Sequence, residues 1–259
     1  MSALEVQIGR ASTRCALAAV LPHVGSTETL SRVRFTFESA RRLLVSATAG
    51  STAAVARIHV HDVVALPELA VVDLEPRSVR EVLAVFTPPS NKDERAMWNA
   101  EAFTLRITDD EVSWLEDSPV MEGRSLSVPR LPALGESESS YPDIPGVTAR
   151  FLNMPPDESA DASVNPQLLA RFVMSAKAYG DDGLRLEMAL RKGTGAYGWT
   201  VQVDRDFAGI LLPIHRRDTE QNELADTRQR WADRLRPLAR PEPRPALARA
   251  GDPNPKETR

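Results

Sequence analysis

One pattern of elements occurs three times along this chain, and it constrains the fold more than any other feature. Each occurrence is an amphipathic helix followed by three short strands. The pattern is clearest at residues 163–217. There Leu168, Phe172 and Ala176 recur at helical spacing after Pro166, which suits a first helical turn, and the residues that follow alternate between apolar and polar. The repeat predicts an α+β fold made of helices plus antiparallel strands, in about three copies of one module.

The two upstream copies follow the same order of elements. In the first, a short strand at 4–8 leads into a helix at 11–24, which Pro22 should kink or end. In the second, a strand near 71–74 precedes the helix. The remaining expected elements are three strands between residues 31 and 62, a helix at 76–86, a polar loop at 87–101 and three strands between residues 102 and 131.

Composition suggests where the domains begin and end. Residues 132–162 are rich in Pro, Ser, Glu, Asp and Gly, and they are longer than loops within compact domains usually are. Residues 237–259 are rich in Pro and Arg and lack the apolar residues that a core requires. We therefore expect a two-unit domain at 1–131, a connector at 132–162, a third unit at 163–217, a polar helix at 218–236 and a disordered tail at 237–259.

Length and composition exclude several protein classes. The 259 residues suffice for one large domain or two smaller ones, and the aromatic content of only 5% predicts a core of Leu, Val and Ala. The single cysteine excludes an internal disulfide and fits a reducing compartment. No apolar run reaches the ~18 residues of a membrane span, so we expect a soluble, cytoplasmic protein without membrane contact. The net charge of −4 argues against a wholly basic surface but allows a local one.

The sequence contains no convincing catalytic or metal-binding motif. Residues 193–198 match G-x-G-x-x-G, but a strand rather than a helix is expected after them, so we interpret the match as a hairpin loop. His59 and His61 share one face of a strand without a third ligand nearby. His23 has no obvious carboxylate or nucleophile partner, and Cys15 lies among apolar helical neighbours. We therefore expect no enzyme activity, no cofactor and no metal.

The distribution of charge is the more informative feature. The three predicted helices of the repeat carry six basic residues against one acid, Glu81. Basic residues three or four apart share a helix face, and a basic layer of helices is suited to sequence-independent contact with phosphates. The alternative is that these are ordinary solvated side chains. The candidate DNA-binding residues are Arg10, Arg14, Arg77, Arg80, Arg171 and Lys177.

Four stretches of the sequence carry a resemblance to a known family. They are the opening strand and helix followed by TLSRVRFTFES at 29–39, the strand LLVSATAG at 43–50, the connector SYPDIPGV at 140–147, and NPQLL at 165–169 with GILLPIHR at 209–216. Together they resemble the DNA polymerase sliding clamp family in its bacterial beta-clamp form, divergent and shortened, with a phage type as one option. The resemblance implies helices that line a central hole, sheets that form an outer ring, and duplex DNA and a polymerase or clamp-loader-like protein as partners.

Two departures from the family pattern bear on function. Ser51-Thr52-Ala53 stand where the family has Asp-Gly-His-Arg-Leu, which weakens this loop as a contact for DNA or partner. Only three half-domain units are present, whereas the rings of the family contain twelve. Because an unpaired unit would leave a sheet edge and an apolar helix face exposed, we expect a homo-oligomer. The alternative is a relative of the clamps that closes no ring.

The resemblance also implies a pocket for short partner peptides. The residues at the matching positions are Pro142, Val147, Leu212, Pro213 and Ile214, and all of them are apolar. The competing interpretation is that they are core and turn residues. The leading functional hypothesis is therefore a clamp-like processivity or tethering factor on DNA. The alternative hypotheses are a clamp-fold interaction module that does not encircle DNA, and an unrelated α+β structural protein.

Overall fold

The computed structural model describes eleven ranges of the chain, and it separates two compact units, Met1–Ile214 and His215–Arg259. The finer domain boundaries predicted within the first unit stay a prediction. The described ranges are 4–39, 42–63, 71–116, 123–132, 134, 141–157, 162–180, 185–193, 196–203, 205–214 and 218–236.

The first copy of the repeat opens with β1 (Leu4–Gly9) and α1 (Arg10–Val20). The helix ends just before Pro22, because proline has no amide hydrogen and its ring clashes with the preceding turn, and one short 3-10 helix, η1 (Leu21–His23), follows. The helix is therefore shorter than the predicted 11–24. The three predicted strands are β2 (Val33–Ser39), β3 (Arg42–Thr48) and β4 (Thr52–Val63).

The second copy contains a helix that the sequence analysis did not predict. The expectation of a polar loop at 87–101 is wrong, because α3 (Lys92–Ala100) lies within it. The side chain of Asn91 caps this helix by accepting a hydrogen bond from the backbone N–H of Asp93 at 2.9 Å, and Trp98 is buried. The other elements are β5 (Val71–Leu74), α2 (Pro76–Val85), β6 (Ala102–Ile107), β7 (Glu111–Glu116) and β8 (Ser125–Pro129).

The third copy follows a helix within the predicted connector, α4 (Ile144–Asn153). The G-x-G-x-x-G match does lie in a hairpin, since Gly193 pairs with Ala196 and a strand follows. Leu184, which was expected to begin the first strand, lies outside the described residues. The elements of this copy are α5 (Pro166–Ala178), β9 (Glu187–Gly193), β10 (Ala196–Val203) and β11 (Phe207–Leu211).

All eleven strands that the structure describes belong to one antiparallel, branched sheet. The first two copies give the order β5-β2-β3-β4-β1-β6-β7-β8, and a bridge between Leu74 and Arg130 brings β5 next to the end of β8. These strands therefore almost close on themselves. The long strand β4 is the branch point, because one of its edges pairs with β11 near Thr52 and with β1 near Val63. The strands β10 and β9 continue outward from β11.

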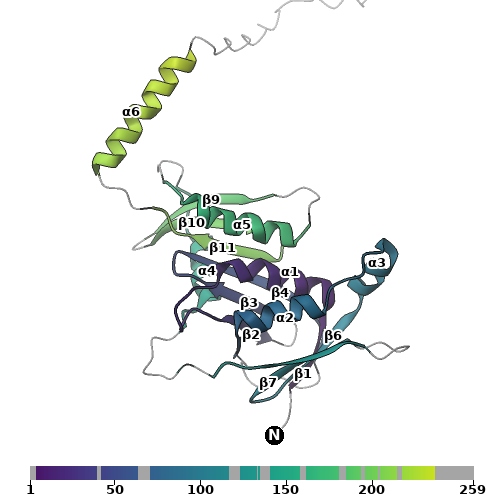
Figure 1. Cartoon of the computed structure of the whole chain (residues 1–259). Coiled ribbons are helices and arrows are strands. Elements are labelled where there is room, and N and C mark those ends of the chain that lie inside the picture. Colours follow the sequence, from purple (N-terminus) through teal and green to yellow (C-terminus); the bar gives the residue numbers. More distant parts are fainter. Residues whose placement is uncertain are drawn as a thin grey trace, which may run out of the picture. The chain divides into compact units, whose positions relative to one another are not determined.

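The helices cover both faces of the sheet. Figure 1 shows α2, α1 and α5 side by side in that order. Along β4, Ala54 and Ala56 belong to the main core under these helices, whereas the alternate residues Ala53 and Val55 belong to a smaller core with α4. The period of two along a strand thus separates the two layers. The predicted fold class, an α+β fold of helices plus antiparallel strands in three repeated units, is confirmed.

The contact between α1 and α5 joins the first and third copies. The Ser175 hydroxyl donates a hydrogen bond to the carbonyl of Ala19 at 2.7 Å, and the His23 Nε2 lies 3.0 Å from the same hydroxyl. The His23 ring packs against Phe172, with 4.4 Å between ring centroids. Burial, together with the nearby charge of Arg171, lowers the pKa of His23 to about 3. The imidazole is therefore neutral in the folded protein.

The second compact unit contains the predicted polar helix, α6 (Asp218–Leu235). Trp231 and Leu235 on this helix are both more than half exposed. Among the described residues, no helix combines the length and the apolar character that crossing a membrane would require. The tail at 237–259, which was predicted to be disordered, lies outside the described residues.

Candidate nucleic-acid and partner interfaces

Arg10 was predicted to contact DNA, but the structure buries it. Its side chain is only 4% exposed, its Nε donates a hydrogen bond to the carbonyl of Ala102 at 2.9 Å, and it is paired with Glu101. The guanidinium also stacks on the rings of Trp98 and Phe103. A guanidinium held in this way is not available to phosphate, so Arg10 is removed from the candidate DNA-binding residues.

Arg14 also has a structural role. Its Nη1 donates hydrogen bonds to the carbonyls of Leu83 and Phe86, at 2.5 and 2.8 Å, where α2 ends. A cation at this position satisfies carbonyls that have no partner within the helix and interacts favourably with the helix dipole. Burial lowers the pKa of Arg14 from its usual value. The prediction that Arg14 contacts DNA is therefore replaced by a role in capping α2.

Arg14 is the only charged residue among the half-buried side chains of α1, and it is held by the end of α2. No residue of α1 is fully exposed, and the half-buried residues Ala11, Cys15 and Ala18 form a stripe at helical spacing. Arg171 on the neighbouring α5 is half-buried, and its Nη1 lies 3.5 Å from the Thr52 hydroxyl. The middle of the helical layer thus offers few cations to a polyanion, which the sequence pattern did not indicate.

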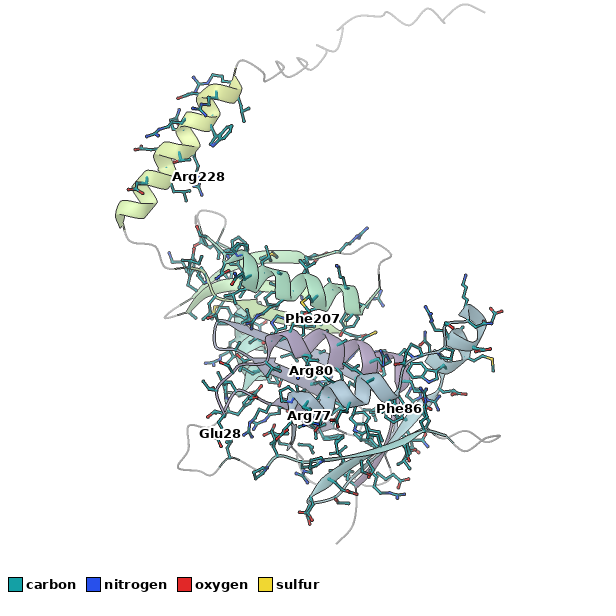
Figure 2. All side chains as sticks on the ribbon, viewed as in Figure 1. Glu28, Arg77, Arg80, Phe86, Phe207 and Arg228 are labelled. Carbon is teal, nitrogen blue, oxygen red and sulfur yellow. The ribbon has the colours of Figure 1, made fainter. Side chains whose placement is uncertain are left out.

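Three of the predicted DNA-binding residues do lie on the surface of the helical layer. Arg77 and Arg80 project from α2 (Figure 2), and Lys177 lies on α5. Arg77 forms an ion pair with Glu81 one turn away, at 3.1 Å. Such an exposed pair contributes little stability, so it yields readily to a phosphate. Arg77, Arg80 and Lys177 remain the candidate phosphate contacts.

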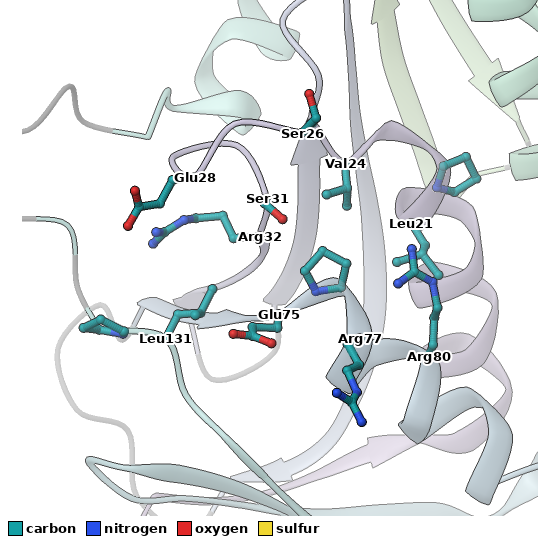
Figure 3. A pocket seen from close by; sticks show the side chains of 14 residues that line it. Leu21, Val24, Ser26, Glu28, Ser31, Arg32, Glu75, Arg77, Arg80 and Leu131 are labelled. Carbon is teal, nitrogen blue, oxygen red and sulfur yellow. The ribbon is translucent and has the colours of Figure 1, made fainter.

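A cleft of about 960 Å³, which no sequence pattern indicated, lies between the end of α1 and the start of α2. In Figure 3, Glu28 and Arg32 lie on one side of this cleft, and Arg77 and Arg80 on the other. Glu75 lies near the start of α2, so acidic side chains offset part of the basic charge. The cleft's residues come from segments that are distant in the sequence, and no local pattern marks them.

A buried network of charges borders this cleft, since Arg32 belongs to both. Asp73 accepts hydrogen bonds from Arg32 and from Arg34, each at 2.8 Å. Arg34 also stacks on the ring of Tyr141, 4.3 Å from its centroid. Burial opposes the charge of Arg34, but its hydrogen bonds to Asp73 prevail and raise its pKa. These arginines are therefore committed to the fold and do not form a free basic surface.

A second buried network fixes α3 to the strands. Glu116 accepts hydrogen bonds from Trp98 Nε1 at 2.8 Å and from two nitrogens of Arg124, at 2.6 and 2.7 Å. Burial alone would raise the pKa of Glu116, but the hydrogen bonds and the positive charge of Arg124 overcome it and lower this pKa. The carboxylate thus stays charged in the folded protein.

The residues predicted to form a peptide pocket come from α4 and from the end of β11. Val147 packs in the small core with α4, and Pro142 is exposed just before this helix. The backbone N–H of Leu212 donates to the Ser51 carbonyl at 2.9 Å, so this segment lies beside the β3–β4 turn. The side chains of Leu212 and Ile214 are 40% and 43% exposed, and Pro213 between them is half-buried. Apolar surface is present here, and its use as a pocket stays a prediction.

Solved structures share this fold. The chain is similar to the DNA polymerase sliding clamp of Bacillus subtilis, with 13% identity and a TM-score of 0.55 over 82% of this chain and 64% of the other. It is similar to the DNA polymerase III subunit beta of Pseudomonas aeruginosa, with 12% identity and a TM-score of 0.53 over 84% and 67%. The subunit beta of Borrelia burgdorferi matches with 9% identity and a TM-score of 0.52 over 82% and 64%.

These comparisons establish the fold. The chain has a divergent form of the bacterial sliding clamp fold, as its sequence resemblance implied. It spans about two thirds or less of the length of the clamps that it matches. No protein-family model matches the sequence, and no curated protein matches it.

Proposed function

We propose that this protein is a non-enzymatic, clamp-like tether that holds a polymerase or a clamp-loader-like partner on duplex DNA. The observation that carries this proposal is the clamp fold over about four fifths of the chain. The helices α2, α1 and α5 form one layer, as the helices that line the hole of a clamp would. The role requires a location with the DNA, which for a bacterial-type clamp is the cytoplasm, and a homo-oligomer if DNA is to be encircled.

In this proposal, phosphate contact depends on Arg77, Arg80 and Lys177, with a smaller part for the half-buried Arg171. These side chains act as point charges that follow the DNA backbone without reading bases. The binding should therefore be independent of sequence and strongly weakened by salt.

Charge reversal on the full-length chain tests the proposal. Replacing Arg77, Arg80 and Lys177 together by Glu should reduce affinity for a duplex at ~50 mM salt at least about tenfold, and lower the slope of log affinity against log salt by about 3. A matched control replaces Arg42, Arg150 and Arg205 by Glu, which are exposed residues outside the helical layer. The control changes net charge equally, so it separates local contact from a general charge effect.

A second candidate function is a clamp-fold interaction module that does not bind DNA. The half-buried stripe of Ala11, Cys15 and Ala18 on α1 and the exposed side chains of Leu212 and Ile214 favour it. The same experiment discriminates between the two. Absence of duplex binding by the native chain at ~50 mM salt, or equal binding by the test and control variants, would reject the DNA tether in favour of the module.

A further inference from the structure

The arginines near the end of this chain differ in charge balance from everything before them. Residues 228–249 contain seven arginines and two acids, a net charge of +5, whereas the whole chain has a net charge of −4 and the rest of it therefore −9. A polyanion should be attracted to this segment and repelled by most of the remaining surface. The first part of the segment forms the last turns of α6.

These last turns place the positive charge around an exposed aromatic ring. Trp231 is 55% exposed, and the guanidinium of Arg234 lies over its ring, 5.5 Å from the ring centroid. Arg228, which projects from α6 in Figure 2, comes three residues before Trp231, and Arg234 comes three residues after it. Residues three apart share a helix face, so the two arginines flank the ring.

The acidic residue nearest to Trp231 in the sequence, Asp233, faces away from the ring. A separation of two residues is about 200° around an α-helix. Asp233 accepts hydrogen bonds from Gln229 Nε2 at 3.0 Å and from Arg236 Nη2 at 2.9 Å, so its charge is partly neutralised on the opposite face. The face of α6 around Trp231 is therefore basic.

An exposed aromatic ring among cations is suited to binding a single-stranded nucleic acid. Every base has a flat face that stacks on an aromatic ring, and the cations contact the phosphates. A duplex stacks its bases on one another and offers Trp231 no free base face, and an acidic peptide would engage the arginines without the ring. A membrane surface is a poor match, because Leu224, Trp231 and Leu235 are the only large apolar residues in the sequence of this helix.

We infer that the C-terminal half of α6, with the arginine-rich sequence that follows it, binds a single-stranded polynucleotide. Trp231 stacks on an unpaired base, and Arg228, Arg230 and Arg234 contact the phosphates. Further arginines follow at intervals of four or five residues, at positions 236, 240, 244 and 249, so the contacts extend along the strand. The site shares no residue with the candidate duplex contacts on α2 and α5, and the inference does not depend on duplex binding.

Binding of fluorescently labelled oligothymidylate and oligouridylate to the full-length chain, followed by anisotropy at ~50 mM salt, tests the inference. Probes of ~20 nucleotides exceed the length that such sites occupy. Binding of either probe supports the inference, and the tighter one identifies DNA or RNA as the source of the strand. Trp231→Leu keeps an apolar side chain but removes the ring, so it should weaken binding about tenfold. Trp231→Phe keeps a ring and should retain most of the affinity.

The salt dependence of binding tests the role of the arginines. Each phosphate contact on a single strand contributes about 0.7 to the slope of log affinity against log salt, so Arg230→Gln combined with Arg234→Gln should lower this slope by about 1.4. The matched control is Arg150→Gln combined with Arg205→Gln, at exposed positions of the first compact unit. It removes the same charge and should leave the slope unchanged.

Tryptophan emission provides an independent readout of stacking. Trp98 and Trp114 are buried and Trp199 is half-buried, so a stacked base should quench mainly the emission of Trp231. The single-stranded probes should quench wild type but not Trp231→Phe, although this variant still binds them. A duplex of the same length should leave the emission of wild type unchanged.

Three results would overturn the inference. They are a wild-type chain that binds neither probe, binding that Trp231→Leu leaves unchanged, and quenching by the duplex equal to that by the single strands. Either of the first two would assign Leu224, Trp231 and Leu235 to an apolar groove on a protein partner instead. Each variant should keep the wild-type circular dichroism spectrum, because the substituted side chains are exposed.

Discussion

Acid should weaken the contact between α1 and α5, because His23 is buried there as a neutral imidazole. The folded-state pKa of His23 is about 3, whereas that of an unfolded chain is 6.5. Between these values the unfolded chain binds a proton that the folded chain does not. Stability from this residue is therefore fully present above pH 6.5 and is lost as the pH falls.

The magnitude follows from the difference between the two pKa values. At about 1.4 kcal/mol per pH unit, the complete effect approaches about 5 kcal/mol below pH 3. At pH 5, where few carboxylates titrate, the loss relative to pH 7.5 is about 2 kcal/mol. The side chain is fully buried, so solvent does not screen this effect appreciably.

Urea unfolding at pH 7.5 and pH 5.0, followed by tryptophan fluorescence, measures the effect. His23→Gln retains a polar group near Ser175 but does not titrate. This variant should be less stable than wild type at pH 7.5, because it loses the ring contact with Phe172. Between pH 7.5 and pH 5.0, however, its free energy of unfolding should fall by about 2 kcal/mol less than that of wild type. His61→Gln, at an exposed position, should keep the wild-type dependence. An unaltered pH dependence in His23→Gln would refute the reasoning.

Three further substitutions test the structural roles assigned above, each measured by urea unfolding. Arg14→Met should cost about 1–2 kcal/mol, because carbonyls at the end of α2 lose their donor, and Arg77→Met on the same layer should cost close to nothing; equal effects would contradict the capping role. Glu116→Gln should lower the free energy of unfolding by about 2 kcal/mol at pH 7. The difference between wild type and this variant should shrink as the pH falls through the lowered pKa of the Glu116 carboxyl. Gly209→Ala should cost about 1–3 kcal/mol, since a Cβ there would lie 2.5 Å from Phe172 and 2.6 Å from the backbone oxygen of Ala53; a neutral effect would mean that the sheet yields more than its packing suggests.

Local patterns in the sequence predicted most of the fold. The spacing of Leu168, Phe172 and Ala176, and the alternation along β4 and β10, are set by the helical and strand periods, which are visible without any partner. The repeated module was predicted from these periods, and the α+β class was predicted from the module. The helix α3 was missed because its surface is polar. Its single buried residue among the described residues is Trp98, which contacts Phe103 on β6, Glu116 on β7 and the guanidinium of Arg10, and the sequence of the helix shows none of these contacts.

The candidate sites were predicted less well, because exposure is a property of the assembled chain. In the sequence, Arg10 and Arg14 resemble Arg77 and Arg80 as pairs of cations on a helix face. The structure separates them, since Arg10 contacts a carbonyl 92 residues away and Arg14 one 69 residues away. No local pattern encodes such partners. The cleft at the start of α2 was missed for the same reason.

The sequence by itself determined the module, its number of copies and the resemblance to sliding clamps, because each depends on residues that lie near one another in the chain. The tertiary structure decided which charges are free and which surfaces lack a cover. It paired β11 with β4 and made the first copy the neighbour of both others. The physical reason is that the burial of a residue depends on which surfaces meet in the folded chain. Those surfaces come from segments that are far apart in the sequence, and no regular spacing of residues reveals that they meet.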